Sequence, residues 1–282
     1  MSSLIKKIIK KTLLTSSSAF SSTKLGKLIN EQIIENVMQR EKSIIHNDIN
    51  MTFSVPNKLN HFRIDTFSEK EPETLEWIDE IPHNSILWDI GANVGLYSIY
   101  AAKRRNCQVF AFEPSVFNLE LLARNIYLNN LQEQITIFPL ALANKLGSNT
   151  MRLTSKEWGG ALSSFGENLD WDGKKINDIF SFSTFGCTMD QLVSIFKLPK
   201  PDYIKMDVDG NEHYILEGGL NILKEIQGIL IEINDNYIEQ RNRSEGILNK
   251  SGLSFKEKRH SEILDSGKFS KLFNQIWVKN NK

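Results

Sequence analysis

The sequence predicts an α/β protein built around a mostly parallel β-sheet, and two observations lead to this class. From Ile86 onward, short apolar runs rich in β-branched residues alternate with amphipathic stretches of ten or more residues, which is the pattern of βα units on a parallel sheet. A turn containing Gly91 and Gly95 follows the first apolar run, at the position where open α/β sheets bind nucleotide-like ligands.

Seven strands are expected from the apolar runs. They cover residues 85–89, 108–112, 135–139, 202–206, 228–233, 253–257 and 274–278. Helices are expected between them, most clearly over residues 97–104, 117–129, 189–196 and 212–223. The segment 147–186 interrupts the alternation because it is rich in Ser, Thr, Gly and aromatic residues without a helical period. We expect this segment to form a hairpin and loop that cover a pocket.

The chain is predicted to consist of a helical extension over residues 1–61 and one domain over residues 62–282. A serine-rich run over residues 15–23 separates a short basic helix from a second helical segment over residues 24–44. The basic helix places Leu4, Ile5, Ile8 and Ile9 on one face and Lys6, Lys7, Lys10 and Lys11 on the other. It is expected to be solvated or docked on the domain, and the alternative is contact with an anionic membrane surface.

Charge and composition exclude several classes of partner. Lysine plus arginine equals aspartate plus glutamate, at 34 each, so no overall field attracts nucleic acid. No run reaches the roughly 18 apolar residues of a membrane span, and the first residues lack the apolar core of a secretory signal, so a cytoplasmic location is expected. The two cysteines, Cys107 and Cys187, are expected to be buried free thiols.

The strongest local motif is the run from Trp88 to Gly95, which ends an apolar strand and opens a helix. Gly91 and Gly95 permit a tight turn and let a ligand lie against the main chain. Asp89 at the strand end would repel a pyrophosphate but attract the ammonium group of a methionine moiety. Asn93 stands where the dinucleotide fingerprint has its second glycine. The turn therefore favours S-adenosylmethionine over NAD, with these four residues as its binding residues.

Two further residues are predicted to contact the same ligand. Glu113 ends the next strand, about 20 residues beyond the turn, which is the spacing at which an acidic side chain meets ribose hydroxyls. Ala141 follows the third strand, where an adenine ring would lie, so its backbone is expected to border the base.

Acidic residues collect after the fourth and fifth strands. Asp207 ends the fourth strand and is expected to orient an acceptor hydroxyl or take its proton, helped by Glu212 or Glu232. With Asn234 and Asp235, these oxygens could also hold a magnesium ion. Acidic rims also occur in metal-free enzymes, so no residue is assigned as a metal ligand.

The remaining residues of this motif are given structural roles. Asp209 and Asn211 are expected to form a turn and cap the following helix. His213 is expected to be a structural or exposed histidine.

Taken together, these stretches resemble the FkbM family of S-adenosylmethionine-dependent methyltransferases, from about residue 57 to about residue 255. The resembling stretches are Phe62-Arg63, residues 70–78, the glycine turn with Tyr97-Ser98, residues 112–114, residues 188–190, residues 205–212 and Gly218-Gly219. The resemblance implies a Rossmann-like class I methyltransferase fold. In that fold a mostly parallel seven-stranded sheet has helices on both faces and an antiparallel last strand, which residues 274–278 suit.

The resemblance also implies a function. Such proteins methylate an oxygen, so the expected acceptor is a hydroxyl of a sugar, polysaccharide or polyketide-like small molecule. Cofactor contacts carry over to Asp89, Gly91, Gly95, Glu113 and Asp207. The family often has glutamate where this chain has Asp209, which leaves the role of that position open.

Two other classes of function stay open at this point. An NAD-dependent reductase shares the sheet and the glycine turn, but Asp89, Asn93 and the lack of a Tyr-x-x-x-Lys pair after the fourth strand disfavour it. A non-catalytic module could keep the cofactor pocket, although the intact turn and Glu113 disfavour it too. A nucleic-acid methyltransferase is weaker still, since the chain has no Asn/Asp-Pro-Pro-Tyr/Phe sequence.

Overall fold

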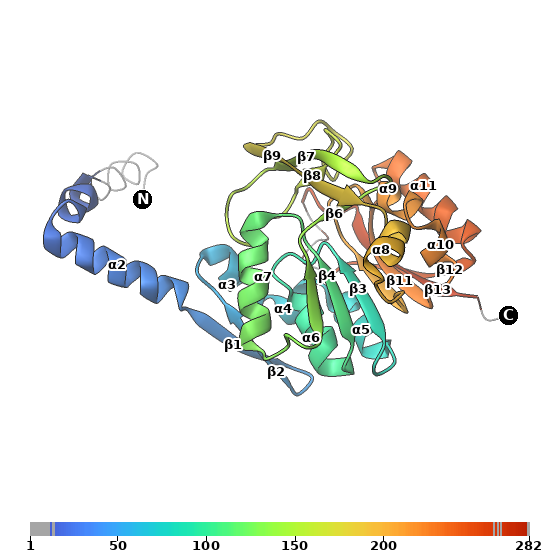
Figure 1. The fold of residues 1–282 in the computed structure, drawn as a ribbon, viewed down its shortest axis with the longest axis horizontal. Coiled ribbons are helices and arrows are strands. Elements are labelled where there is room, and N and C mark those ends of the chain that lie inside the picture. The colour runs from blue at the N-terminus through green and yellow to red at the C-terminus, as the bar shows by residue number, and fades with distance from the viewer. Residues whose placement is uncertain (1–11, 13–14, 262, 264, 266, 281–282) are drawn as a thin grey trace.

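The computed structural model describes residues 12, 15–261, 263, 265 and 267–280. Its centre is a seven-stranded sheet with the order β12-β13-β11-β10-β3-β4-β5 (Figure 1). The strands are β3 (Ile86–Ile90), β4 (Gln108–Phe112), β5 (Ile135–Phe138), β10 (Tyr203–Met206), β11 (Gly228–Asn234), β12 (Leu253–Arg259) and β13 (Leu272–Lys279). β13 runs antiparallel to both of its neighbours, and the other neighbouring pairs are parallel. The predicted Rossmann-like sheet with an antiparallel last strand is confirmed.

Helices cover both faces of the sheet, as predicted. They are α5 (Pro72–Glu80), α6 (Leu96–Arg105), α7 (Val116–Leu128), α8 (Met189–Phe196), α9 (Glu212–Glu217), α10 (Leu220–Leu223) and α11 (Ile238–Lys250). Because side chains alternate along a strand, β3 contributes to two hydrophobic cores. Leu87 packs in the core with residues of α5, α6 and α7. Trp88 and Ile90 pack in the core with residues of α8 to α11.

The helix predicted over residues 212–223 is broken into α9 and α10 at Gly218 and Gly219. A Cβ at Gly218 would lie 2.3 Å from the carbonyl oxygen of Ala143, and one at Gly219 would lie 2.0 Å from the methyl carbon of Met189. The two glycines therefore let the break pack closely against its neighbours, which helical periodicity alone does not reveal.

The helical segment predicted over residues 24–44 is confirmed as far as Met38 and is wrong over residues 39–44. Helix α2 (Lys24–Met38) ends early, and β1 (Glu41–His46) and β2 (Ile49–Ser54) form an antiparallel hairpin. Asn47 and Asp48 both have positive φ, at 46° and 64°, as a two-residue hairpin turn of the favoured type requires.

Two short helices follow, α3 (Lys58–Asp65) and α4 (Phe67–Lys70). Met51 and Phe53 of β2 are buried in the core under α5 to α7, and the domain boundary at residue 62 stays a prediction.

The interrupting segment, together with the short strand β6 before it, forms a second sheet of four strands in the order β6-β9-β7-β8. Its strands are β6 (Ala141–Leu142), β7 (Gly147–Leu153), β8 (Ser164–Phe165) and β9 (Phe180–Cys187). β7 and β9 pair antiparallel along their length, so the expected hairpin with a long loop is present. Figure 1 shows this sheet beyond one end of the central strands.

Three smaller predictions concern the cysteines and the chain's relation to membranes. Cys107 and Cys187 are buried free thiols, as predicted. Among the described residues, no helix is both long enough and apolar enough to cross a membrane. The basic helix with Leu4 and Lys6 lies outside the described residues.

Two asparagines of α7 hold the N-terminal hairpin. Asn125 accepts the Ser54 N–H at 2.8 Å and donates to the Val94 carbonyl at 2.8 Å. Asn129 accepts the Thr52 N–H at 3.1 Å and donates to the Thr52 carbonyl at 2.6 Å. Because β2 pairs with β1 alone, these side chains satisfy backbone groups on the other edge of β2.

Replacing Asn125 with Leu, which has a similar volume, should lower the free energy of unfolding by about 2–6 kcal/mol. Two buried backbone groups lose their partners, and each such loss costs about 1–3 kcal/mol. Urea denaturation measures the change, and Asn249→Leu on the exposed side of α11 is the control, expected within about 0.5 kcal/mol of the native chain. Equal stability of Asn125→Leu and the native chain would contradict this role.

Candidate active site

A cavity of about 330 Å³ lies at the carboxyl ends of β3, β4, β10 and β11. Its volume falls within the range of small-molecule sites. The wall combines the glycine turn over residues 90–94, the end of β10 with Asp207, and residues 160–163 of the inserted segment. The insertion therefore borders a pocket, as predicted.

The glycine turn is fixed by close packing behind it. Gly91 has φ +83°, and a Cβ there would lie 1.8 Å from the carbonyl oxygen of Asp207. Gly95 has φ +85°, and its Cβ would lie 2.5 Å from a methyl carbon of Leu122. Gly91 lines the cavity, whereas Gly95 lies behind the wall and supports the turn through α7.

Asn93 and Glu113 are joined on the cavity wall. The Asn93 N–H donates to Glu113 at 2.8 Å, and the Ser115 N–H donates to the other carboxylate oxygen at 2.7 Å. Burial outweighs these hydrogen bonds and raises the pKa of Glu113 to about 7. The Asn93 side chain donates to the Gly160 carbonyl at 2.9 Å, and its own Oδ1 is buried without a partner. Glu113, Asn93 and Ala141 all line the cavity.

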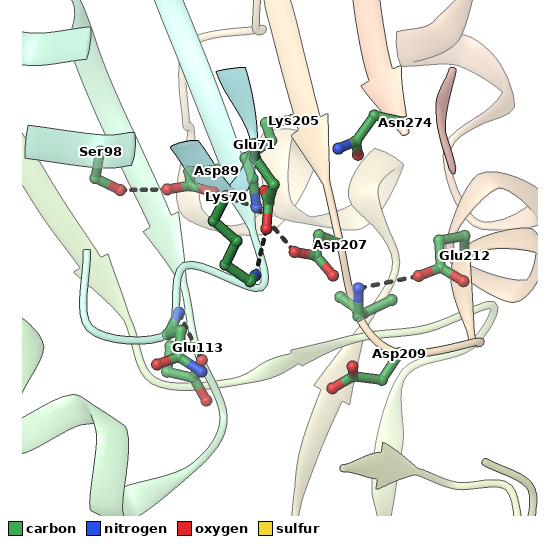
Figure 2. A network of polar contacts seen from close by, with 12 residues as sticks. Lys70, Glu71, Asp89, Ser98, Glu113, Lys205, Asp207, Asp209, Glu212 and Asn274 are labelled. Atoms are coloured by element: carbon green, nitrogen blue, oxygen red, sulfur yellow. Dashed lines mark hydrogen bonds and ion pairs between the residues drawn. The ribbon is translucent and has the colours of Figure 1, made fainter. Parts of the chain in front are cut away.

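The structure does not bring Asp89 to the cavity wall, which corrects its predicted role. Its side chain is 1% exposed. One oxygen accepts from the Ser98 hydroxyl at 2.5 Å, and the other lies 3.6 Å from the ammonium group of Lys205 (Figure 2). Because side chains alternate along β3, Asp89 points to the face covered by α6. Its charge is therefore balanced inside the protein, and direct attraction of a ligand is not its role.

Lys205 is the central cation of the site, and it was not predicted. It stands in the middle of β10, paired in register with Asp89 of β3, and its side chain is 3% exposed. The ammonium lies 3.6 Å from both Asp89 and Asp207, and 5.3 Å from the centre of the Tyr97 ring. Burial alone would lower the pKa of Lys205, but the surrounding carboxylates outweigh it and raise that pKa.

The signal for Lys205 is present in the sequence. A lysine within an apolar strand of a parallel sheet must be buried, and a buried ammonium needs carboxylate partners. One more partner, Glu71, comes from the chain before α5 and forms an ion pair with Lys70 at 2.5 Å. Burial alone would raise the pKa of Glu71, but Lys70 and Lys205 lower it to about 2. No spacing rule connects Glu71 with β10.

Three carboxyl groups form an acidic rim on the cavity wall: Asp207, Asp209 and Glu232. One oxygen from each lies within 4.8 Å of the others. Burial and then the neighbouring charge of Asp207 raise the pKa of Asp209 to about 6 and that of Glu232 well above its usual value. The rim therefore holds a proton to higher pH than isolated carboxylates would, because closely spaced carboxylates resist full ionisation.

Asp209 has more than the turn-forming role predicted for it. Its φ of +59° fits a turn. Its carboxylate accepts the N–H groups of Leu162 and Ser163, at 2.6 and 3.2 Å, and it lines the cavity. Asn211 lies at the start of α9, but its side chain donates to Ser164 at 3.0 Å and does not cap the helix.

Glu212 is not placed to act on a substrate, which corrects its assignment as a catalytic residue. It is fully buried and accepts the N–H groups of Val208 and Gly210, at 3.0 and 3.1 Å, while Gln240 donates to it as well. Burial raises its pKa to about 7. From the first turn of α9, Glu212 therefore holds the backbone of the loop that contains Asp207 and Asp209 in place.

His213, Asn234 at the end of β11 and Asp235 after it also lie away from the cavity. His213 is buried, and burial lowers its pKa to about 4, in agreement with a structural histidine. Asn234 donates to the Trp171 carbonyl at 3.1 Å, and Asp235 pairs with Lys258 at 2.8 Å. The wider set of magnesium ligands suggested by the sequence is therefore not assembled.

The chain was compared with protein families and characterised proteins. The model described as "Methyltransferase FkbM domain" matches residues 89–266. Hexuronic acid methyltransferase AglP of Haloferax volcanii is 27% identical over 165 residues, covering 56% of this chain and 59% of that protein. Methyltransferase sdnD of Sordaria araneosa is 26% identical over 172 residues, covering 50% and 62%. The chain thus spans about three fifths of the length of these relatives.

Solved structures with a similar chain path were also found. Precorrin-6y C5,15-methyltransferase of Geobacter metallireducens aligns with a TM-score of 0.43 and 13% identity, over 74% of this chain and 87% of that one. P. horikoshii TYW2 in complex with MeSAdo aligns with a TM-score of 0.46 and 11% identity, over 85% and 72%. The family match is the informative comparison, because it covers most of the chain and includes the glycine turn, Glu113 and the acidic rim. The chain belongs to the FkbM methyltransferase family.

Proposed function

We propose that the protein is an S-adenosylmethionine-dependent O-methyltransferase acting on a hydroxyl of a sugar, polysaccharide or polyketide-like molecule. One observation carries the proposal: a single cavity joins the glycine turn and Glu113 to the acidic rim at Asp207. Family membership supports methyl transfer as the reaction class. The name of one relative, hexuronic acid methyltransferase, supports a sugar as the acceptor.

The residues on the wall fit S-adenosylmethionine. Glu113 keeps lone pairs beyond the two N–H groups that it accepts, so it can accept ribose hydroxyls. The buried, unpartnered Oδ1 of Asn93 is an acceptor for a ligand donor. Gly91 exposes main chain, and Ala141 borders the same cavity where adenine is expected. When bound, this cofactor supplies an electrophilic methyl group on a positively charged sulfur.

The predicted electrostatic preference for a cationic ligand comes from other residues than Asp89. The wall carries more carboxyl groups than cationic side chains. The carboxyl groups are Glu71, Glu113, Asp207, Asp209 and Glu232, and the cations are Arg63, Lys70 and Lys205. The three cations offset part of this charge, and the acidic groups are concentrated at the rim of Asp207, Asp209 and Glu232, which a positively charged sulfonium would face.

Asp207 is the group proposed to accept the proton of the acceptor hydroxyl. Its side chain is 29% exposed toward the cavity, and Lys205 supplies a positive charge 3.6 Å away. Burial and the neighbouring carboxylates raise the pKa of Glu232 well above its usual value, which favours its protonated form, so Glu232 can donate a hydrogen bond to an acceptor oxygen. These side chains would hold the hydroxyl in place and take its proton when the cofactor supplies the methyl group, and positioning of the hydroxyl would contribute most of the rate.

Calorimetry with S-adenosylhomocysteine and with NAD tests the ligand class. We expect S-adenosylhomocysteine to bind and NAD not to bind, because Asn93 stands where a dinucleotide turn has its second glycine. NAD binding alone would contradict the proposal in favour of a reductase, and binding of neither would favour a non-catalytic module. Mass spectrometry of sugar and glycan acceptors with isotopically labelled cofactor then identifies the product by one added methyl group.

Asp207→Asn should reduce turnover about 100-fold or more, because general base catalysis contributes about 10²–10⁴-fold. Its affinity for S-adenosylhomocysteine should stay within about three-fold of the native value, since the amide keeps the shape of the carboxylate. Asp235→Asn, at the end of β11 but off the wall, is the matched control and should keep full turnover. Unchanged turnover of Asp207→Asn with a confirmed acceptor would remove Asp207 from the chemistry.

Binding of S-adenosylmethionine should release protons between about pH 6 and pH 7. The pKa of Asp209 is raised to about 6, and a sulfonium beside the acidic rim favours its ionised form, so its proton leaves. The pKa of Glu113 is raised to about 7, and ribose hydroxyls that donate to it favour its ionised form with either ligand. S-adenosylhomocysteine lacks the sulfonium charge and should release fewer protons. Asp209→Asn should reduce the difference between the two ligands. Calorimetry in buffers of different ionisation enthalpy measures the number of protons released on binding. Equal release with both ligands would contradict an acidic rim next to the sulfur.

A further inference from the structure

Helix α2 presents an apolar face to solvent. Leu25, Leu28, Ile29 and Ile33 are 62%, 64%, 38% and 51% exposed. Their spacing places them on one side of an α-helix. Figure 1 shows α2 extending away from the central sheet and its covering helices. A contiguous exposed apolar row of this kind marks an interaction surface.

The first half of α2 is covered on its other side, whereas Ile34 in the second half is 62% exposed there. Gly26 is buried, and a Cβ there would lie 1.8 Å from the Phe20 carbonyl oxygen. Asn30, one turn further, donates to Ser21 at 2.7 Å. The chain before α2 therefore packs along the side that carries Gly26 and Asn30 and leaves the apolar face open.

Charges along α2 are separated by sign. Lys24 and Lys27 lie in its first half, and Glu31 and Glu35 lie in its second half. At about 100° per residue, all four fall on the same flank of the apolar face. In a parallel two-fold pair, this flank would face the opposite flank of the partner, so these lysines and glutamates would not pair with one another. In an antiparallel pair, each lysine meets a glutamate: Lys24 faces the partner's Glu35, and Lys27 faces the partner's Glu31.

We propose that α2 pairs antiparallel with α2 of a second copy of this chain, burying the apolar face in a two-fold dimer. An interface that is complementary to itself closes after two copies. The lysines and glutamates of α2 balance, and the two glutamates on the flank disfavour an anionic membrane as the occupant, since surface helices that bind such membranes have a basic polar face.

Two charge variants test the pairing by sedimentation equilibrium of the full chain. Lys24→Glu with Lys27→Glu makes the flank wholly acidic, and Glu31→Lys with Glu35→Lys makes it wholly basic. We expect the native chain to be dimeric at tens of micromolar, each variant alone to dissociate at least about ten-fold more readily, and an equimolar mixture of the two to form heterodimers. Reversing all four charges in one chain should restore the native dimer.

Binding of S-adenosylhomocysteine is the folding control, because α2 lies outside the cavity, and all variants should match the native affinity. A native chain that stays monomeric over this range would overturn the proposal, as would charge variants that dimerise like the native chain. A monomer that sediments with phosphatidylglycerol vesicles would also overturn it, in favour of a membrane surface.

Discussion

The buried ammonium group of Lys205 is the interaction on which the arrangement of the site depends. It lies between Asp89 of β3 and Asp207 at the end of β10, 3.6 Å from each. A charge removed from water costs several kcal/mol unless opposite charges surround it. The fold therefore has to bring the ammonium group of Lys205 and these two carboxylates together. Gly91 fits against the carbonyl of Asp207 at the same junction. The glycine turn after β3 and the end of β10, which form two sides of the cavity, therefore depend on each other for their positions.

The inserted segment also connects the glycine turn with the acidic rim, through its own backbone groups. The carbonyl of Gly160 accepts from Asn93 of the glycine turn and from Asn118 of α7, at 2.9 and 3.0 Å. Next to it, the N–H of Leu162 donates to Asp209 on the acidic rim. The segment thus bridges the part of the wall proposed to hold the methyl donor and the part proposed to hold the acceptor. Such a bridge can exclude water from a methyl transfer and hold two substrates at a fixed separation.

Local patterns of the sequence predicted most of the fold. The seven strands and the main helices follow from hydrophobic periodicity, which can be recognised within a short stretch of sequence. The β1–β2 hairpin was missed because Ile44 and Ile45 extend the apolar pattern of α2, while the turn signal lies in Asn47 and Asp48, which tolerate positive φ. The interruption at Gly218 could not be predicted because it depends on packing against β6 and α8.

The residues of the site also fall into those that local sequence patterns predict and those that depend on tertiary packing. Gly91, Asn93 and Glu113 were placed on the wall because the turn and the spacing to the next strand are local features. The orientation of Asp89 depends on which sheet face α6 covers, and the role of Glu212 depends on the backbone of the loop above it. These are three-dimensional relations that residue identity does not specify.

The most direct test of the central claim is a double-mutant cycle on Lys205 and Asp89, measured by urea unfolding. Lys205→Met leaves two carboxylates without their cation and should lower the free energy of unfolding by about 3–5 kcal/mol. Combined with Asp89→Asn, the loss should be smaller than the sum of the two single losses by about 1–3 kcal/mol. Losses that add to within about 0.5 kcal/mol would show that the two groups do not support each other.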